Sequence, residues 1–173
     1  SAAKRLPDKD AFAGKVLESQ AAAPLEARTR LFEILSVVGG QKALKAVVAS
    51  ARGSEEDLKN AAMRVLGEWK SEDAAPEILE LVKSFASDKD RRSALASFRR
   101  VVGGLRFPKE ERLALCQQAM DAARNDDERK LVLGTLAAIP AVETFALLTP
   151  HLANPAIKED AASAAVAIGE RIL

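Results

Sequence analysis

Helix-ending turns recur along this chain at intervals that fit one pair of helices each. Five of them follow directly after two apolar residues, and they lie at Gly39, Gly67, Gly103, Pro140 and Gly169. The four gaps are 28, 36, 37 and 29 residues long, and most turns precede a second amphipathic helical stretch. A single helix pair cannot bury its apolar stripe, whereas stacked pairs share a continuous core. The spacing therefore predicts an all-α chain of about five antiparallel helix pairs.

The composition provides the side chains that such stacking needs. Of the 173 residues, 34 are Ala and 21 are Leu, while aromatic residues make up only 4%. Ala and Leu are strong helix formers, and a shortage of aromatic and β-branched residues argues against a β-sandwich or barrel. Small alanine side chains also allow neighbouring helices to approach closely. We therefore expect a core of Ala, Leu, Val and Ile.

Capping signals and prolines divide the chain into ten helical stretches. We interpret Gly39-Gly40 and Gly103-Gly104 as helix C-caps, and we interpret acidic turns such as Ser54–Asp57 as helix starts. The expected helices cover about 8–22, 25–38, 41–52, 58–70, 74–87, 88–102, 108–123, 125–139, 141–152 and 156–172. There is no long linker or shift in composition, so we predict one domain over 1–173.

Two adjacent stretches carry a family pattern. Residues 58–67 contain paired alanines and a Leu-Gly ending, and residues 71–82 add an acidic turn and an Ala-x-Pro-x-Leu-like second helix. This pattern resembles a HEAT repeat of the compact bacterial kind, over about 24–173. The resemblance implies a right-handed α-solenoid, or α–α superhelix, with a capping helix at about 8–22. The implied repeats span about 24–53, 54–87, 88–123, 125–153 and 155–173.

A second resemblance concerns the C-terminal third. Residues 128–134 and 159–168 resemble HEAT modules within large exported bacterial proteins, which often carry a concanavalin-like sugar-acting domain. This implies an accessory module of such a protein, without a catalytic residue of its own. Ser1–Pro7 contains neither an initiator Met nor the apolar stretch of a signal peptide. We therefore interpret the sequence as a signal-free fragment, and the resemblance points to an exported bacterial parent.

Charge and rare residues narrow the possible functions. The net charge is +1, and the chain contains one His and one Cys. A single cysteine excludes a disulfide scaffold and multi-Cys zinc or iron–sulfur sites. No apolar run approaches the length of a membrane-spanning helix. We interpret Cys116 as a buried thiol and His151 as a surface or helix-end residue. We expect no enzyme activity, no catalytic residue, no metal, no cofactor and no membrane partner.

The strongest local charge feature is the segment 88–112, which contains eight basic and four acidic residues. Its basic residues are Lys89, Arg91, Arg92, Arg99, Arg100, Arg106, Lys109 and Arg112. Arg92 and Arg99 are seven residues apart and share a helix face, so a phosphate or an acidic partner could bind there. The alternative interpretation is a solvated face with local ion pairs.

We expect the helices at about 41–52, 74–87, 108–123 and 141–153 to line a concave face, the default binding surface of a solenoid. The candidate partner-binding residues are Arg92, Arg99, Arg100, Arg112, Lys83, Glu80 and Trp69. Trp69 could be an exposed partner anchor or could pack over the turn between repeats. The leading hypothesis is a non-catalytic protein-binding or scaffold module for another protein or a neighbouring domain. The alternative is a nucleic-acid-binding solenoid, which requires the arginines of 88–112 to converge on one face.

Overall fold

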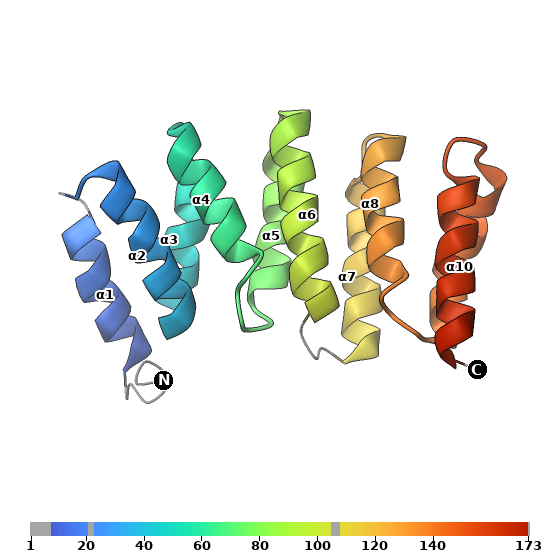
Figure 1. Cartoon of the computed structure of the whole chain (residues 1–173), viewed down its shortest axis with the longest axis horizontal. Coiled ribbons are helices and arrows are strands. Elements are labelled where there is room, and N and C mark those ends of the chain that lie inside the picture. Colours follow the sequence, from blue (N-terminus) through green and yellow to red (C-terminus); the bar gives the residue numbers. More distant parts are fainter. Residues whose placement is uncertain (1–7, 21–22, 105–107, 173) are drawn as a thin grey trace.

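The computed structural model of the chain describes residues 8–20, 23–104 and 108–172, and this part contains no β-strand. Ten α-helices and one 3-10 helix, η2, follow one another along it (Figure 1). Their bounds are α1 Lys9–Gln20, α2 Leu25–Val38, α3 Gln41–Ala51, α4 Glu56–Leu66, α5 Ala74–Ser84, α6 Asp88–Gly104, α7 Lys109–Ala122, α8 Asp126–Leu136, α9 Val142–Leu148, η2 Thr149–Ala153 and α10 Lys158–Ile172. The predicted all-α class is confirmed.

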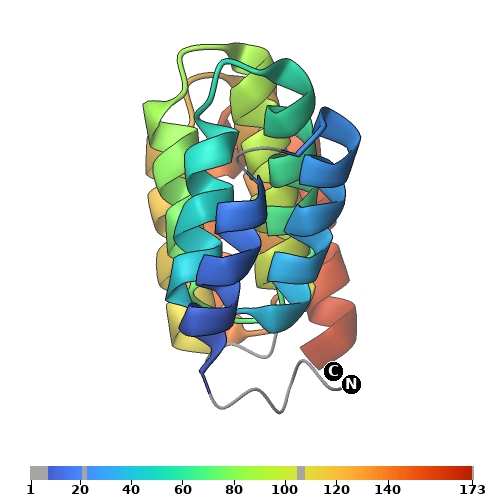
Figure 2. The same cartoon turned by 90° about the vertical axis from the view of Figure 1, so that its left-hand side faces the viewer.

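The helices form two layers. One layer, here called the even row, contains α2, α4, α6, α8 and α10, each packed against the next. The other layer, the odd row, contains α1, α3, α5 and α7, which also pack in succession, and Figure 2 shows the two layers end-on. The most extensive packing between the layers joins α5 with α6 and α3 with α4. Packing between neighbours is compatible with a solenoid.

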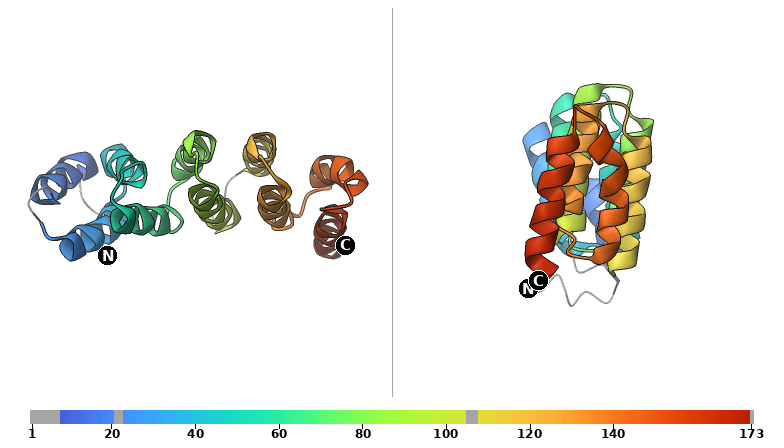
Figure 3. Two further views of the ribbon diagram at one scale, coloured as in Figure 1. Left: turned by 90° about the horizontal axis from the view of Figure 1, so that it is seen from above. Right: turned by 90° about the vertical axis from the view of Figure 1, so that its right-hand side faces the viewer.

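The array bends gently when seen from above. Its two ends turn toward the even row, so the even row lies on the inner side of the bend (Figure 3). The helices at 41–52, 74–87 and 108–123 form the odd row on the outer side. The predicted concave face was therefore assigned to the wrong layer, because the repeat spacing does not determine which helix of a pair lies inside.

Small aliphatic residues fill the space between the layers, as the composition predicts. Helix α6 illustrates the pattern, because Ala94, Leu95, Phe98, Val101 and Val102 are all buried on one side of it. Buried alanines lie on most helices, including Ala43, Ala62, Ala75, Ala119 and Ala161. Their lack of bulk lets neighbouring helices pack closely.

Several predicted boundaries hold, and others move. Helix α2 spans the predicted 25–38, and α7 lies within the predicted 108–123. Gly39 and Gly40 have φ of 70° and 92°, which suits a helix-ending glycine. Gly103 and Gly104 are the last two residues of α6, so this helix extends two residues beyond the predicted end at Val102. Neither has the positive φ that ends a helix in this way.

The predicted helix at 141–152 is divided into α9 and η2. Pro150 lies at the start of η2 and has no backbone N–H to continue an α-helical ladder. None of the helices in the described ranges is long and apolar enough to cross a membrane.

Candidate binding surface

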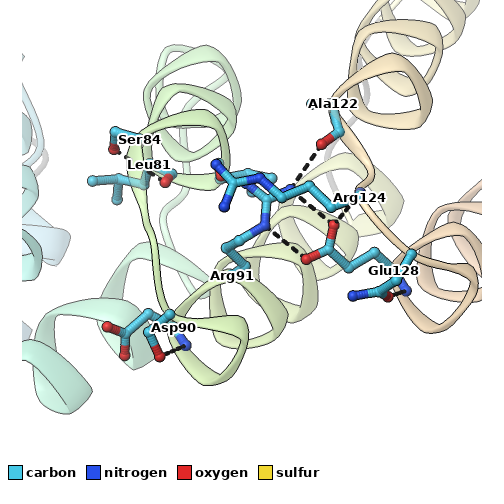
Figure 4. A network of polar contacts seen from close by, with 10 residues as sticks. Leu81, Ser84, Asp90, Arg91, Ala122, Arg124 and Glu128 are labelled. Atoms are coloured by element: carbon cyan, nitrogen blue, oxygen red, sulfur yellow. Dashed lines mark hydrogen bonds and ion pairs between the residues drawn. The ribbon is translucent and has the colours of Figure 1, made fainter.

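A buried ion pair joins the neighbouring helices α6 and α8 (Figure 4). Arg91 Nε lies 2.7 Å from Glu128 Oε1, and Arg91 Nη2 lies 2.8 Å from Glu128 Oε2. The guanidinium also donates to the carbonyls of Val82, on α5, and Ala122, on α7. The backbone N–H of Arg124 donates to Glu128 Oε2 over 2.8 Å. These five residues, here called the Arg91 network, connect α5, α6, α7 and α8.

The electrostatics of the pair follow from its burial. The two side chains are 1% and 0% exposed, so water cannot replace either partner. The hydrogen bond from Arg91 lowers the pKa of the Glu128 carboxyl, and the same bond raises the pKa of the Arg91 guanidinium. Both groups are therefore charged at neutral pH. Arg91 is a structural residue, so it does not belong to the exposed arginines that the nucleic-acid alternative requires on one face.

A sequence signal for this pair existed but was missed. Arg91 precedes Ala94, Leu95 and Phe98 at helical spacing, so it falls on the buried side of α6. Glu128 has the same relation to Val132 on α8. A charged residue in the apolar register of a helix requires a buried partner.

The exposed arginines of α6 are Arg92, Arg99 and Arg100, here called the α6 arginines. Within the described ranges, none of the three forms an ion pair. Arg99 lies against α8, where its Nη1 would be 3.4 Å from a Cβ added to Gly134. Arg100 lies against the end of α4, with its Cζ 3.3 Å from a Cβ added to Gly67. The α6 arginines are thus displayed on the even row.

An open groove of about 300 Å³ lies beside Arg99 on this row. Here called the α6–α10 groove, it is lined by Arg99 from α6, by Lys130, Gly134 and Ala137 from α8, and by Asp160, Ser163 and Ala164 from α10. Small residues leave room along it, while two cations and one carboxylate border it. Lys130 Nζ is 3.8 Å from Asp160 Oδ2, a long contact between exposed groups.

The other basic residues of 88–112 do not converge with the α6 arginines. Lys89 pairs with Glu56, on the neighbouring α4. Lys109 on α7 pairs with Glu143 at 2.8 Å. Arg106 lies outside the described residues.

Arg112 belongs to the odd row. Its Nη2 donates to the Ala138 carbonyl over 3.1 Å, and desolvation by burial lowers the pKa of the guanidinium. The convergence that the nucleic-acid alternative requires is therefore not met, because Arg91 is buried and Arg112 lies in the other layer.

Two further candidate residues, Glu80 and Lys83, also lie in the odd row. They form an exposed ion pair at 2.8 Å on α5. Lys83 also borders a shallow depression with Gln118 and Asp121 of α7. The predicted partner-binding residues are thus divided between two faces.

Trp69 is a packing residue. Its side chain is only 2% exposed, and its Nε1 donates to Ser71 Oγ over 3.0 Å. It packs at the turn between α4 and α5, as the second interpretation of the sequence stated. An exposed anchor at this position was the wrong alternative.

Cys116 is buried on α7, where desolvation raises the pKa of its thiol to about 12. It therefore remains protonated and unreactive at neutral pH.

The acidic turn before α8 acts as a helix cap. The Asn125 side chain accepts a hydrogen bond of 2.9 Å from the Glu128 backbone N–H. No cluster of three or more His, Cys, Asp or Glu side chains that could hold a metal occurs in the described ranges.

Comparison with known proteins adds no identification. No protein-family model matches the chain, and a search of curated proteins finds no match. The functional argument therefore depends on the surface itself.

Proposed function

We propose that this chain is a non-catalytic binding or scaffold module that holds another protein, or a neighbouring domain, on its even row. The proposal includes a HEAT-like architecture, a right-handed α-solenoid of about five antiparallel helix pairs. The two-layer packing of successive helices and the gentle bend of the array support this architecture. An accessory role within a larger exported bacterial protein is part of the proposal and comes from the sequence resemblance.

The single observation that carries the proposal is the placement of the α6 arginines. They lie exposed on the inner side of the bend, without ion pairs among the described residues, beside the open α6–α10 groove. Arginine is enriched in protein interfaces because its planar guanidinium offers five donors. On α5 and α7 of the odd row, Lys83 and Lys109 are already engaged by Glu80 and Glu143.

Peptide selection followed by mapping tests this proposal. A displayed library of random peptides is selected against the whole chain, and the binders are titrated into ¹⁵N-labelled protein. We expect amide shifts on α4, α6, α8 and α10. A selection without binders, or shifts confined to α1, α3, α5 and α7, would contradict the proposal.

A further inference from the structure

We infer that the α6–α10 groove, together with the α6 arginines, binds an acidic peptide segment of the partner through its carboxylates. This inference rests on the proposed function and specifies the chemistry of the partner. Its first support is the state of Arg99. The side chain lies against α8 at Gly134, yet it makes no side-chain hydrogen bond or ion pair with any described residue.

An arginine held in this way is preorganised to bind a planar anion. A guanidinium that lies along a helix has restricted motion, so less conformational freedom is lost when it binds. Its parallel N–H groups match the two oxygens of a carboxylate. A Cβ at position 134 would lie in ordinary contact with the Arg99 guanidinium at 3.4 Å, so a side chain longer than that of alanine would crowd it.

The surroundings favour several spaced carboxylates. Arg92 lies two helical turns before Arg99 on the same face of α6, and Arg100 extends toward α4. Lys130 adds a fourth cation, which is only loosely engaged by Asp160 at 3.8 Å. An extended acidic segment could therefore meet cations from α6 and α8 at successive positions.

The same surface is less suitable for a nucleic-acid duplex. Duplex binding depends on a continuous basic surface that neutralises many phosphates. Two exposed acidic residues lie among the cations, since Asp160 lines the groove with Arg99 and Glu68, in the turn after α4, lines a second depression with Arg100. A short acidic peptide can follow the cations and avoid these positions.

The test measures fluorescence anisotropy of a labelled peptide of alternating Glu and Gly against the full chain. A Gln–Gly peptide and a short DNA duplex serve as comparison ligands. We expect the Glu–Gly peptide to bind most tightly, and its affinity to fall as salt screens the charges. Arg99→Gln should weaken binding about fivefold, the effect of losing one exposed charge contact.

Matched variants separate the groove from general charge. Arg52→Gln removes an exposed arginine after α3, at the odd row, and should leave affinity unchanged. Arg99→Lys keeps the charge but loses the planar fork, so it should weaken binding less than Arg99→Gln. Gly134→Leu fills the groove and should weaken binding although no charge changes. Circular dichroism confirms that each variant is folded.

Distinct outcomes contradict the two proposals. Equal loss in Arg52→Gln and Arg99→Gln, equal binding of the Gln–Gly peptide, or tighter binding of the duplex overturns the acidic-peptide inference. If selected peptides bind the even row without acidic residues and ignore Arg99→Gln, the inference fails while the binding function stands. If no peptide binds at all, the proposed function itself fails.

Discussion

At the scale of single residues, the Arg91–Glu128 pair is the costliest feature to bury. Moving two charges out of water requires close geometry and further hydrogen bonds. Both conditions are present, because the guanidinium contacts the Val82 and Ala122 carbonyls and the carboxylate accepts the Arg124 N–H. The pair matters for stability mainly because removing either partner would leave the other charge buried and unpaired.

Removing the carboxylate alone should therefore destabilise the fold strongly. We expect Glu128→Gln to lower the free energy of unfolding by about 3 kcal/mol, since Arg91 remains buried and charged. Urea denaturation followed by circular dichroism measures this change. Glu143→Gln, at an exposed pair, serves as control and should have little effect. The double variant Arg91→Met/Glu128→Leu should be more stable than Glu128→Gln, and the opposite order would refute this explanation.

The same pair gives a defined dependence on pH. Arg91 lowers the folded-state pKa of Glu128, whereas the unfolded chain has an ordinary glutamate pKa of about 4.3. The stabilisation is therefore complete above about pH 4.3 and is lost as pH falls toward the folded-state pKa. We expect the stability difference between the native chain and Glu128→Gln to be constant from about pH 5 to 7 and to shrink in more acidic solution. A difference that persists unchanged at about pH 3 would contradict the assignment.

At the scale of helices, some N-termini are capped from within and others by a neighbour. Asn125 caps its own helix, α8. The N-cap residue of helix α3 is Gly40, which has no side chain that could accept a hydrogen bond. Asp10 of α1 instead accepts the Lys42 N–H over 3.0 Å. This contact ties the first helix to the third.

Removal of the Asp10 carboxylate, which caps α3, should lower the stability of the fold by a measurable amount. We expect Asp10→Ala to lower the free energy of unfolding by about 1 kcal/mol, the usual effect of an N-cap. Asp10→Asn keeps the acceptor oxygen and should retain most of the stability. Thermal unfolding compares the two variants with Glu18→Ala, an exposed change on the same helix. Equal stability of Asp10→Ala and Asp10→Asn would exclude the capping role.

Local signals account for how well the helices were predicted. Pro24 and Gly39 delimit α2 because their backbone preferences act within the segment itself. Helix α6 continues through Gly103, since glycine adopts helical angles as readily as left-handed ones. Contacts between different helices, such as Asp10 with Lys42 and Arg91 with Glu128, join residues more than thirty positions apart, and local signals do not predict them. The sequence did not predict the α6–α10 groove for the same reason, because the groove forms only when α6, α8 and α10 lie side by side.

At the scale of the whole molecule, stability should vary along the array. Each inner helix packs against neighbours on both sides, whereas the terminal helices α1 and α10 do so on one side only. Arrays of this kind open from their ends because each unit depends on its neighbours.

Hydrogen exchange measures this gradient. We expect the backbone amides of α5 and α6 to exchange most slowly and those of α1 and α10 most rapidly, because opening an end breaks fewer contacts. Mass spectrometry of proteolytic fragments resolves these regions. The same protection in all helices would show that the array unfolds as a single cooperative unit. In Glu128→Gln, the protection of α6 and α8 should fall more than that of α3.

The Arg91 network also has a mechanical consequence. It joins four helices around one buried guanidinium, whereas α2 and α4 are cross-linked by exposed pairs such as Arg64 with Glu33. We therefore expect the array to bend less between α6 and α8 than between α2 and α4. When the ends flex, α6 and α8 keep their separation, so Arg99 and Gly134 move as one rigid piece.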